Sequence, residues 1–339
     1  MPRRWSTETP RSLPRRGNDD MARKGTTKFR RRTVDFRSGD SFCSAWPYLP
    51  DTASDAPLPA VVMGHGLGAT RELGLAPYAE RFAAAGLAVL AFTYRHLGDS
   101  GGAPRQVLSM TKQLADWDAA LKYAAGLPEV DRSRIAVWGS SLGGGHAIAV
   151  AARHPELRAA VAQCPFTDGL ASAGALGVRE SLVLLGFVAR DFLAAARGKE
   201  PVCVPVAAVP GQPGLMTAPD ALPGMLALVP EGYQWVNRAA ARSVLSLIRY
   251  RPGRSAKRIA APILICVSAT DSVAPPAPTE RYARRAPHGD VRLYDAGHFE
   301  FYLGEAFKQL VTDQTEFLVS QLQPAPAPSD PPEQTVTDG

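Results

Sequence analysis

The amino-acid sequence predicts an α/β fold in which a mostly parallel, doubly wound sheet is interrupted by a helical insertion. In residues 33–167 and again in 256–322, short aliphatic and β-branched runs alternate with longer stretches of good helix formers. This alternation is typical of buried parallel strands joined by helices. In residues 168–255 the strand-like runs give way to apolar helical patterns around a Pro/Gly-rich stretch. We therefore predict a core in two parts, separated by an inserted helical cap.

The individual elements follow from the same patterns. Alternating polarity over residues 33–48 predicts an antiparallel hairpin at the sheet edge. The parallel strands are predicted at 60–63, 88–93, 135–138, 159–164 and 263–267, and the helices between them at 78–85, 107–125 and 143–153. Further helices are predicted in the insertion at 179–196, 221–229 and 235–250. We interpret the insertion as an apolar cover over a pocket, with a plain helical subdomain as the alternative.

Composition excludes several classes of protein. With 45% hydrophobic and 21% charged residues, the 339-residue chain is neither disordered nor fibrous, and no apolar run is long enough to span a membrane. The net charge of +6 arises in residues 1–32, which hold 11 Lys/Arg and 3 Asp/Glu, whereas the rest holds 27 and 29. We interpret residues 1–32 as a disordered basic tail and the Pro-rich residues 323–339 as a second tail, and we expect no nucleic-acid partner.

Other sequence features bear on location and ligands. The basic tail lacks the apolar segment of a secretory signal, so we expect a cytoplasmic protein, with either Met1 or Met21 as its start. The four cysteines have no paired spacing and are expected to be buried reduced thiols. No H-E-x-x-H, G-x-G-x-x-G or G-K-[ST] pattern occurs, so neither a metal nor a cofactor is predicted. The sequence specifies no oligomeric state.

A candidate nucleophile lies in the segment Gly-Ser-Ser-Leu-Gly at residues 139–143, which matches G-x-S-x-G with Ser141 at its centre. On its own, a pattern this short can occur by chance. Its context strengthens it, because a strand-like run precedes it and a helix-like run follows, as a nucleophile elbow requires. The sharp turn strains the serine backbone and exposes its hydroxyl, and the flanking glycines remove side chains that would collide. Ser140 is expected to be buried or hydrogen-bonded.

A serine hydroxyl needs a general base and a third group that orients this base. His298 follows a short strand-like run in a Gly-supported turn, and Asp271 follows the strand predicted at 263–267. We expect His298 to be the base and Asp271 the acid. Asp168, which follows the strand after the elbow, is the rival acid. Asp295 lies too close to His298 in sequence to approach it from a neighbouring strand.

The acyl-transfer intermediate also requires backbone N–H groups that stabilise its oxyanion. Leu142, next to the nucleophile, is one expected donor. The other is Leu67, in the glycine-rich loop at residues 64–68 that follows the strand predicted at 60–63. We expect His65 in this loop to shape it through hydrogen bonds rather than to act as a base or metal ligand.

Together these residues resemble the α/β-hydrolase superfamily: His65-Gly66, Ser141, Asp271 and His298 stand in the family's order. Three segments are similar to a narrower group, bacterial hydrolases related to fungal polyketide transferases and, distantly, to X-Pro dipeptidyl-peptidase-like esterases. They are Tyr-Arg-His-Leu-Gly-Asp-Ser-Gly-Gly-Ala-Pro-Arg at 94–105, Gln-Cys-Pro-Phe-Thr-Asp-Gly at 163–169 and Gly-His-Phe-Glu-Phe-Tyr at 297–302. The resemblance implies an α/β-hydrolase fold with a cap over an acyl pocket.

The function expected from these residues is that of a serine esterase or thioesterase acting on a small-molecule acyl substrate. The apolar character of the insertion favours an apolar acyl group over acetate. Three alternatives stay open: an acyltransferase of the polyketide-transferase type, a peptidase of the X-Pro type, and a binding module without turnover. The peptidase would need an anchor for a charged amino terminus, for which Glu180, Asp191 and Glu231 are candidates.

Overall fold

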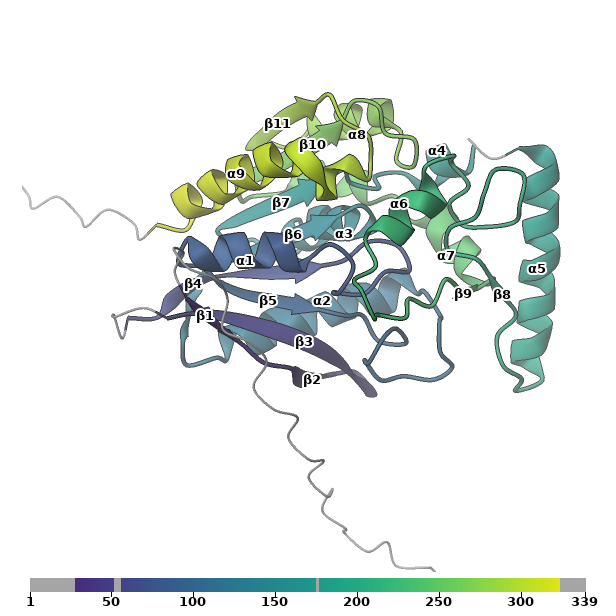
Figure 1. Ribbon diagram of the computed structural model, residues 1–339, viewed down its shortest axis with the longest axis horizontal. Coiled ribbons are helices and arrows are strands. Elements are labelled where there is room, and N and C mark those ends of the chain that lie inside the picture. The colour runs from purple at the N-terminus through teal and green to yellow at the C-terminus, as the bar shows by residue number, and fades with distance from the viewer. Residues whose placement is uncertain (1–27, 52–55, 175–176, 324–339) are drawn as a thin grey trace, which may run out of the picture.

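A nine-stranded sheet runs through the centre of the protein in the computed structural model, which describes residues 28–51, 56–174 and 177–323 (Figure 1). Its order is β1-β3-β5-β4-β6-β7-β10-β11, with β2 also paired to β3. From β5 to β11 neighbouring strands are parallel, whereas β3 is antiparallel to β1, β2 and β5. The strands are β1 (Phe29–Arg31), β2 (Val34–Ser38), β3 (Ser41–Pro50), β4 (Leu58–Gly64), β5 (Ala88–Phe92), β6 (Val130–Ser140), β7 (Ala159–Gln163), β10 (Ile263–Ser268) and β11 (Gly289–Tyr294).

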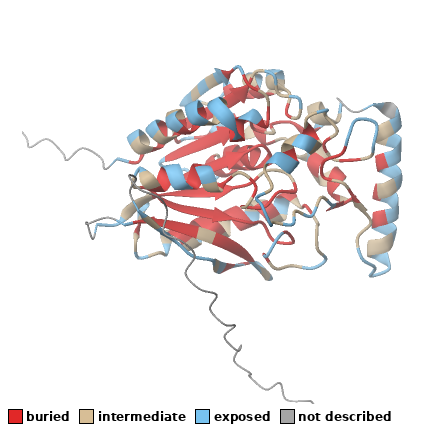
Figure 2. Ribbon diagram, in the orientation of Figure 1, coloured by how far each residue is buried: buried red, intermediate tan, exposed pale blue. Residues whose placement is uncertain are grey.

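Helices cover both faces of this sheet. On one face α1 (Ala76–Ala84) and α9 (Gly304–Gln321) pack on Val61, Met63 and Trp138 from the strands. On the other face α2 (Met110–Ala125), α3 (Leu142–Ala151) and α8 (Pro276–Ala283) pack on the opposite side chains of the same strands, among them Val62 and Val137. Burial on both faces explains why these strands read as continuous apolar runs (Figure 2). The predicted doubly wound α/β-hydrolase fold is confirmed.

The inserted segment lies at the carboxyl ends of the strands (Figure 1). It contains α4 (Gly169–Ala173), α5 (Val178–Ala196), α6 (Ala221–Ala227), α7 (Ser243–Arg249) and the short pair β8 (Cys203–Val204) and β9 (Ala239–Ala240), and the 3₁₀ helix η1 (Pro252–Arg258) leads back to the core. Within the described part of the chain, no helix is long and apolar enough to cross a bilayer.

The helix predicted over residues 235–250 begins only at Ser243, so that prediction was wrong for its first half. In this half, side chains form hydrogen bonds to the backbone of distant segments, and the residues are not helical. The Trp235 indole donates to the Gly68 carbonyl, and the Asn237 amide both donates to and accepts from the Ala207 backbone. Ala239–Ala240 then pairs with β8. These tertiary bonds outweigh the local helical pattern.

The predicted boundary of the basic tail also needs correction. Residues 1–27 and 324–339, which contain most of both predicted tails, lie outside the described residues. Phe29–Arg31, however, form β1 and pair with the end of β3. The Arg31 guanidinium lies 4.6 Å from the centre of the Trp46 ring, and Arg30 forms an ion pair with Asp51. The folded unit therefore begins before residue 33, because these arginines have partners on β3 and just after it.

A buried ion pair joins α2 to the segment after β5. The Arg95 Nε donates to Asp116 Oδ1 at 2.6 Å, and the Arg95 backbone N–H donates to the other carboxylate oxygen. We expect Asp116→Ala to lower the free energy of unfolding by about 3–5 kcal/mol, because it leaves the buried guanidinium without its buried carboxylate partner. Urea unfolding measures this loss. Asp118→Ala is the control: its side chain is 43% exposed, and we expect it to cost less than about 1 kcal/mol. Equal losses would contradict the prediction.

Candidate active site

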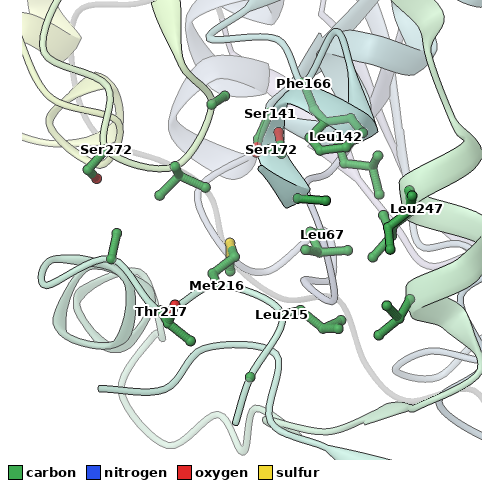
Figure 3. A pocket seen from close by; sticks show the side chains of 18 of the residues that line it. Leu67, Ser141, Leu142, Phe166, Ser172, Leu215, Met216, Thr217, Leu247 and Ser272 are labelled. Atoms are coloured by element: carbon green, nitrogen blue, oxygen red, sulfur yellow. The ribbon is translucent and has the colours of Figure 1, made fainter. Parts of the chain in front are cut away.

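Ser141 lies in the sharp turn between β6 and α3, with φ +56° and ψ −119°. Few non-glycine residues adopt such a backbone conformation. The flanking glycines are required by space: a Cβ at Gly139 would lie 2.0 Å from the Gly143 carbonyl oxygen, and a Cβ at Gly143 would lie 2.4 Å from that of Gly64. The close approach of β4, β6 and α3 thus holds the strained serine in the wall of a cavity (Figure 3).

Hydrogen bonds connect Ser141, His298 and Asp271. His298 Nε2 lies 3.1 Å from Ser141 Oγ, and His298 Nδ1 lies 2.8 Å from Asp271 Oδ2. The other carboxylate oxygen of Asp271 accepts the backbone N–H groups of Val273 and Ala274. Because the carboxylate only accepts, Nδ1 carries a hydrogen and donates it, and in the neutral imidazole this leaves the Nε2 lone pair for the serine hydroxyl. The structure thus brings together the three residues predicted from their order in the sequence.

His298 and His65 have different electrostatic surroundings. Burial opposes the charged form of His298, which is 2% exposed, but the Cys164 and Asp271 side chains outweigh it and raise the pKa of this imidazole well above 6.5. Burial lowers the pKa of His65 to about 3. His65 is therefore neutral, and its ring nitrogens bond to the Gly66 carbonyl and the Tyr94 N–H. It contacts the backbone as a loop-shaping residue would.

The residues considered as alternatives to Asp271 and Ser141 are not hydrogen-bonded to His298 in the described part of the chain. Asp168 caps α4 and binds Arg251 and the Tyr282 hydroxyl. Burial alone would raise the pKa of Asp168, but these hydrogen bonds hold it below its usual range. Asp295 is exposed. The Ser140 hydroxyl is buried, bonds to the Tyr302 hydroxyl and accepts from the Gln163 amide, so it is not available as a nucleophile.

The backbone N–H groups of Leu67 and Leu142 lie on residues that line the cavity beside Ser141. Leu142 is the first residue of α3, so its N–H has no acceptor within the helix. The loop that carries Leu67 approaches the serine closely, since a Cβ at Gly66 would lie 3.2 Å from the Ser141 Cβ. Both predicted oxyanion donors therefore belong to the wall next to the candidate nucleophile.

The cavity at Ser141 has a volume of about 230 Å³ and is mostly apolar (Figure 3). Its lining combines core residues such as Leu67 and Phe166 with residues of the insertion, among them Leu184, Met216 and Leu247. No charged side chain occurs among the described residues that line it. A hydrophobic chain attached to a reactive carbonyl would fit this lining.

Sequence reasoning missed Cys164, which directly follows β7 with a positive φ of 33°. Its Sγ and the ligand atoms of Asp271 and His298 lie within 4.8 Å of one another, and within the described ranges these three residues form the one group with metal-ligand spacing. His298 Nδ1 is already hydrogen-bonded to Asp271 in this group. Its position in the sequence could have indicated this placement, because Cys164 follows β7 and Asp271 follows the neighbouring strand β10.

Comparison with known proteins places the chain in a family. The family described as "Serine aminopeptidase, S33" matches residues 55–300. The quorum-quenching protein AidA of Acinetobacter baumannii (strain MDR-ZJ06) is 49% identical over 285 residues, which are 84% of this chain and 93% of AidA. The polyketide transferase ATR5 of Stachybotrys chlorohalonatus (strain IBT 40285) is 27% identical over 304 residues, or 86% and 98% of the two chains.

A solved structure supports the fold assignment independently. The crystal structure of the α/β-hydrolase GrgF from Penicillium sp. sh18 superposes with a TM-score of 0.75 at 21% identity, covering 86% of this chain and 99% of GrgF. At this identity the likeness concerns the fold alone. The nucleophile-elbow geometry, the sheet topology and the family match over residues 55–300 lead to one assignment. The chain belongs to the α/β-hydrolase family described as serine aminopeptidase S33.

Proposed function

We propose that this protein is a serine hydrolase that cleaves a carboxylic ester or thioester with an apolar acyl group. The observation that carries the proposal is the hydrogen-bonded series from Asp271 through His298 to Ser141, opening into an uncharged cavity of about 230 Å³. The apolar cavity binds the acyl chain, and the strained serine in its wall presents its hydroxyl to the carbonyl.

In the proposed mechanism Ser141 Oγ attacks the acyl carbonyl while His298 Nε2 takes its proton. Asp271 keeps the imidazole in the required tautomer and stabilises the imidazolium. The N–H groups of Leu67 and Leu142 donate to the oxyanion. The imidazolium then gives its proton to the leaving oxygen or sulfur, and the bond between this atom and the carbonyl carbon breaks. Water, activated by His298, releases the acid from the serine.

The insertion supports an acyl chain longer than acetate. We propose that it acts as a cap, because it supplies Leu184, Leu215, Met216 and Leu247 to the same cavity that Ser141 lines. None of the three possible anchors for a peptide amino terminus, Glu180, Asp191 and Glu231, is among the described residues that line this cavity. Asp191 instead binds Arg242 and the Val202 N–H. The hydrolase proposal is therefore favoured over a peptidase.

Acyl transfer is a second candidate for the same acyl-enzyme. Its support is the similarity over 86% of this chain to a protein named a polyketide transferase. In that case an alcohol or amine would accept the acyl group instead of water. Adding such acceptors at fixed substrate concentration and measuring the ratio of acylated acceptor to free acid separates the two reactions.

Acyl-chain length tests the proposed substrate class. We expect kcat/KM for ethyl esters to rise from the acetate to the hexanoate or octanoate, because each methylene buried in the cavity contributes up to about 0.8 kcal/mol to binding. Acid release in a pH-stat, with matching ethyl thioesters in parallel, measures this dependence. A steady fall from the acetate upward would contradict the apolar acyl assignment. A folded protein that releases acid from none of these substrates would favour a binding module.

A further inference from the structure

A second, smaller cavity also borders the candidate nucleophile. It has a volume of about 20 Å³, and its wall contains Ser141, His298, Phe299, Met225 and Leu228. The larger cavity of about 230 Å³ also contains Ser141 but not His298. Ser141, Leu67 and Met216 line both cavities, so the serine lies where the two meet and Met216 belongs to the wall between them.

The position of His298 distinguishes the two parts of a substrate. After Ser141 Oγ has bonded to the carbonyl carbon, the proton on His298 Nε2 must pass to the leaving oxygen or sulfur as the bond from this atom to carbon breaks. The leaving atom must therefore be within hydrogen-bond reach of Nε2, on the side of the small cavity. The acyl chain needs no proton, so it can occupy the large apolar cavity, which His298 does not line.

On the basis of the proposed function, we infer that the small cavity is the leaving-group site. Its volume of about 20 Å³ has room for about one or two water-sized groups. His298 and the buried Tyr302 are the ionisable members of its described lining, and apart from the Ser141 hydroxyl the remaining side chains are apolar. The preferred substrates thus combine a long apolar acyl chain with a compact, uncharged leaving group, such as a short alcohol or thiol.

Packing holds the walls of the small cavity in place. Helix α6 passes so close to Phe299 that a Cβ at Gly224 would lie 2.2 Å from the phenyl ring. Met225, the next residue of α6, is 5% exposed and extends the same wall. The Phe299 ring in turn contacts the His298 ring edge to face, with the ring centres 5.1 Å apart. A bulky leaving group would have to displace this packed wall.

Two substrate series test the inference. In the first, the octanoyl group is kept and the alcohol grows from methanol through butanol to benzyl alcohol. In the second, the methyl ester is kept and the acyl chain grows from acetyl to octanoyl. For the parent protein we expect kcat/KM to fall at least about tenfold from the methyl to the benzyl octanoate and to rise along the acyl series. A parent that prefers benzyl octanoate over methyl octanoate would overturn the inference.

Matched variants assign each preference to its cavity. We expect Met225→Ala to reduce the discrimination against benzyl octanoate about tenfold and to leave the acyl-length dependence unchanged. Leu184→Ala, in the wall of the large cavity alone, is expected to change the acyl-length dependence and not the leaving-group discrimination. If Met225→Ala does not fold, as judged by circular dichroism, Leu228→Ala opens the same cavity. The opposite pattern, in which Met225→Ala changes only the acyl dependence, would overturn the inference.

Failure of the proposed function gives a different result from failure of the inference. If the parent hydrolyses none of the esters in either series, the proposed hydrolysis is wrong and the inference falls with it. If the parent hydrolyses them without discriminating between methyl and benzyl leaving groups, the hydrolase proposal stands and only the leaving-group site is refuted.

Discussion

Ser141→Ala is expected to lower kcat on a short-alcohol ester by about 10⁶-fold, since removal of the nucleophile alone abolishes nearly all catalysis by such a constellation. The same variant should form no covalent adduct with a fluorophosphonate, whereas the parent gains the mass of one phosphonyl group. Intact-mass spectrometry measures the adduct. The variant should remain folded, because alanine removes only a hydroxyl that is hydrogen-bonded to His298.

The neighbouring serine provides the matched control. Ser140 lies one residue away, but its hydroxyl is bonded to Tyr302 and Gln163 inside the protein. We expect Ser140→Ala to keep the single phosphonyl adduct while lowering the free energy of unfolding by about 1–3 kcal/mol, the cost of leaving buried polar partners unsatisfied. An adduct that survives in Ser141→Ala and disappears in Ser140→Ala would refute Ser141 as the nucleophile.

Much of the fold could be predicted because its signals are local. The parallel strands β5, β7 and β10 are buried along their whole length and β4 is buried from Ala60 onward, so each reads as a short apolar run that no exposed helix would contain. The same reasoning reached Ser141, Asp271 and His298, since residues after parallel strands gather at one edge of a sheet. The glycines at 139 and 143 identified the turn because no other residue fits there.

The features that could not be predicted depend on contacts between distant segments. The segment from Trp235 to Ala240 reads as a helix, but its bonds to Gly68, Ala207 and β8 hold it extended. Phe29–Arg31 reads as a charged tail, but it forms an edge strand in which Arg31 packs on Trp46 of β3. The division of the site into two cavities depends on where the insertion places Met216 and Met225, and no local pattern encodes that placement.

Asp271→Asn is expected to lower kcat/KM by about 10⁴-fold and to move the midpoint of its pH dependence to lower pH. Only the neutral imidazole accepts the serine proton, so activity falls as the pH drops through the pKa of His298. Burial lowers this pKa, but the Cys164 and Asp271 side chains raise it well above 6.5, so the parent midpoint should lie above 6.5. Loss of the Asp271 charge removes one of the groups that raise it. The rate of fluorophosphonate labelling between pH 5 and pH 9 reports this midpoint without requiring turnover.

The rival carboxylate separates this effect from a general loss of charge. Asp168→Asn weakens the ion pair with Arg251, whose shortest N–O distance is 2.6 Å, and is expected to lower stability while keeping the parent midpoint, because Asp168 does not contact His298. If instead Asp168→Asn shifts the midpoint and Asp271→Asn does not, the orienting acid is Asp168. A parent whose labelling rate is flat from pH 5 to pH 8 would refute His298 as the base, since an imidazole that takes the serine proton must first be neutral.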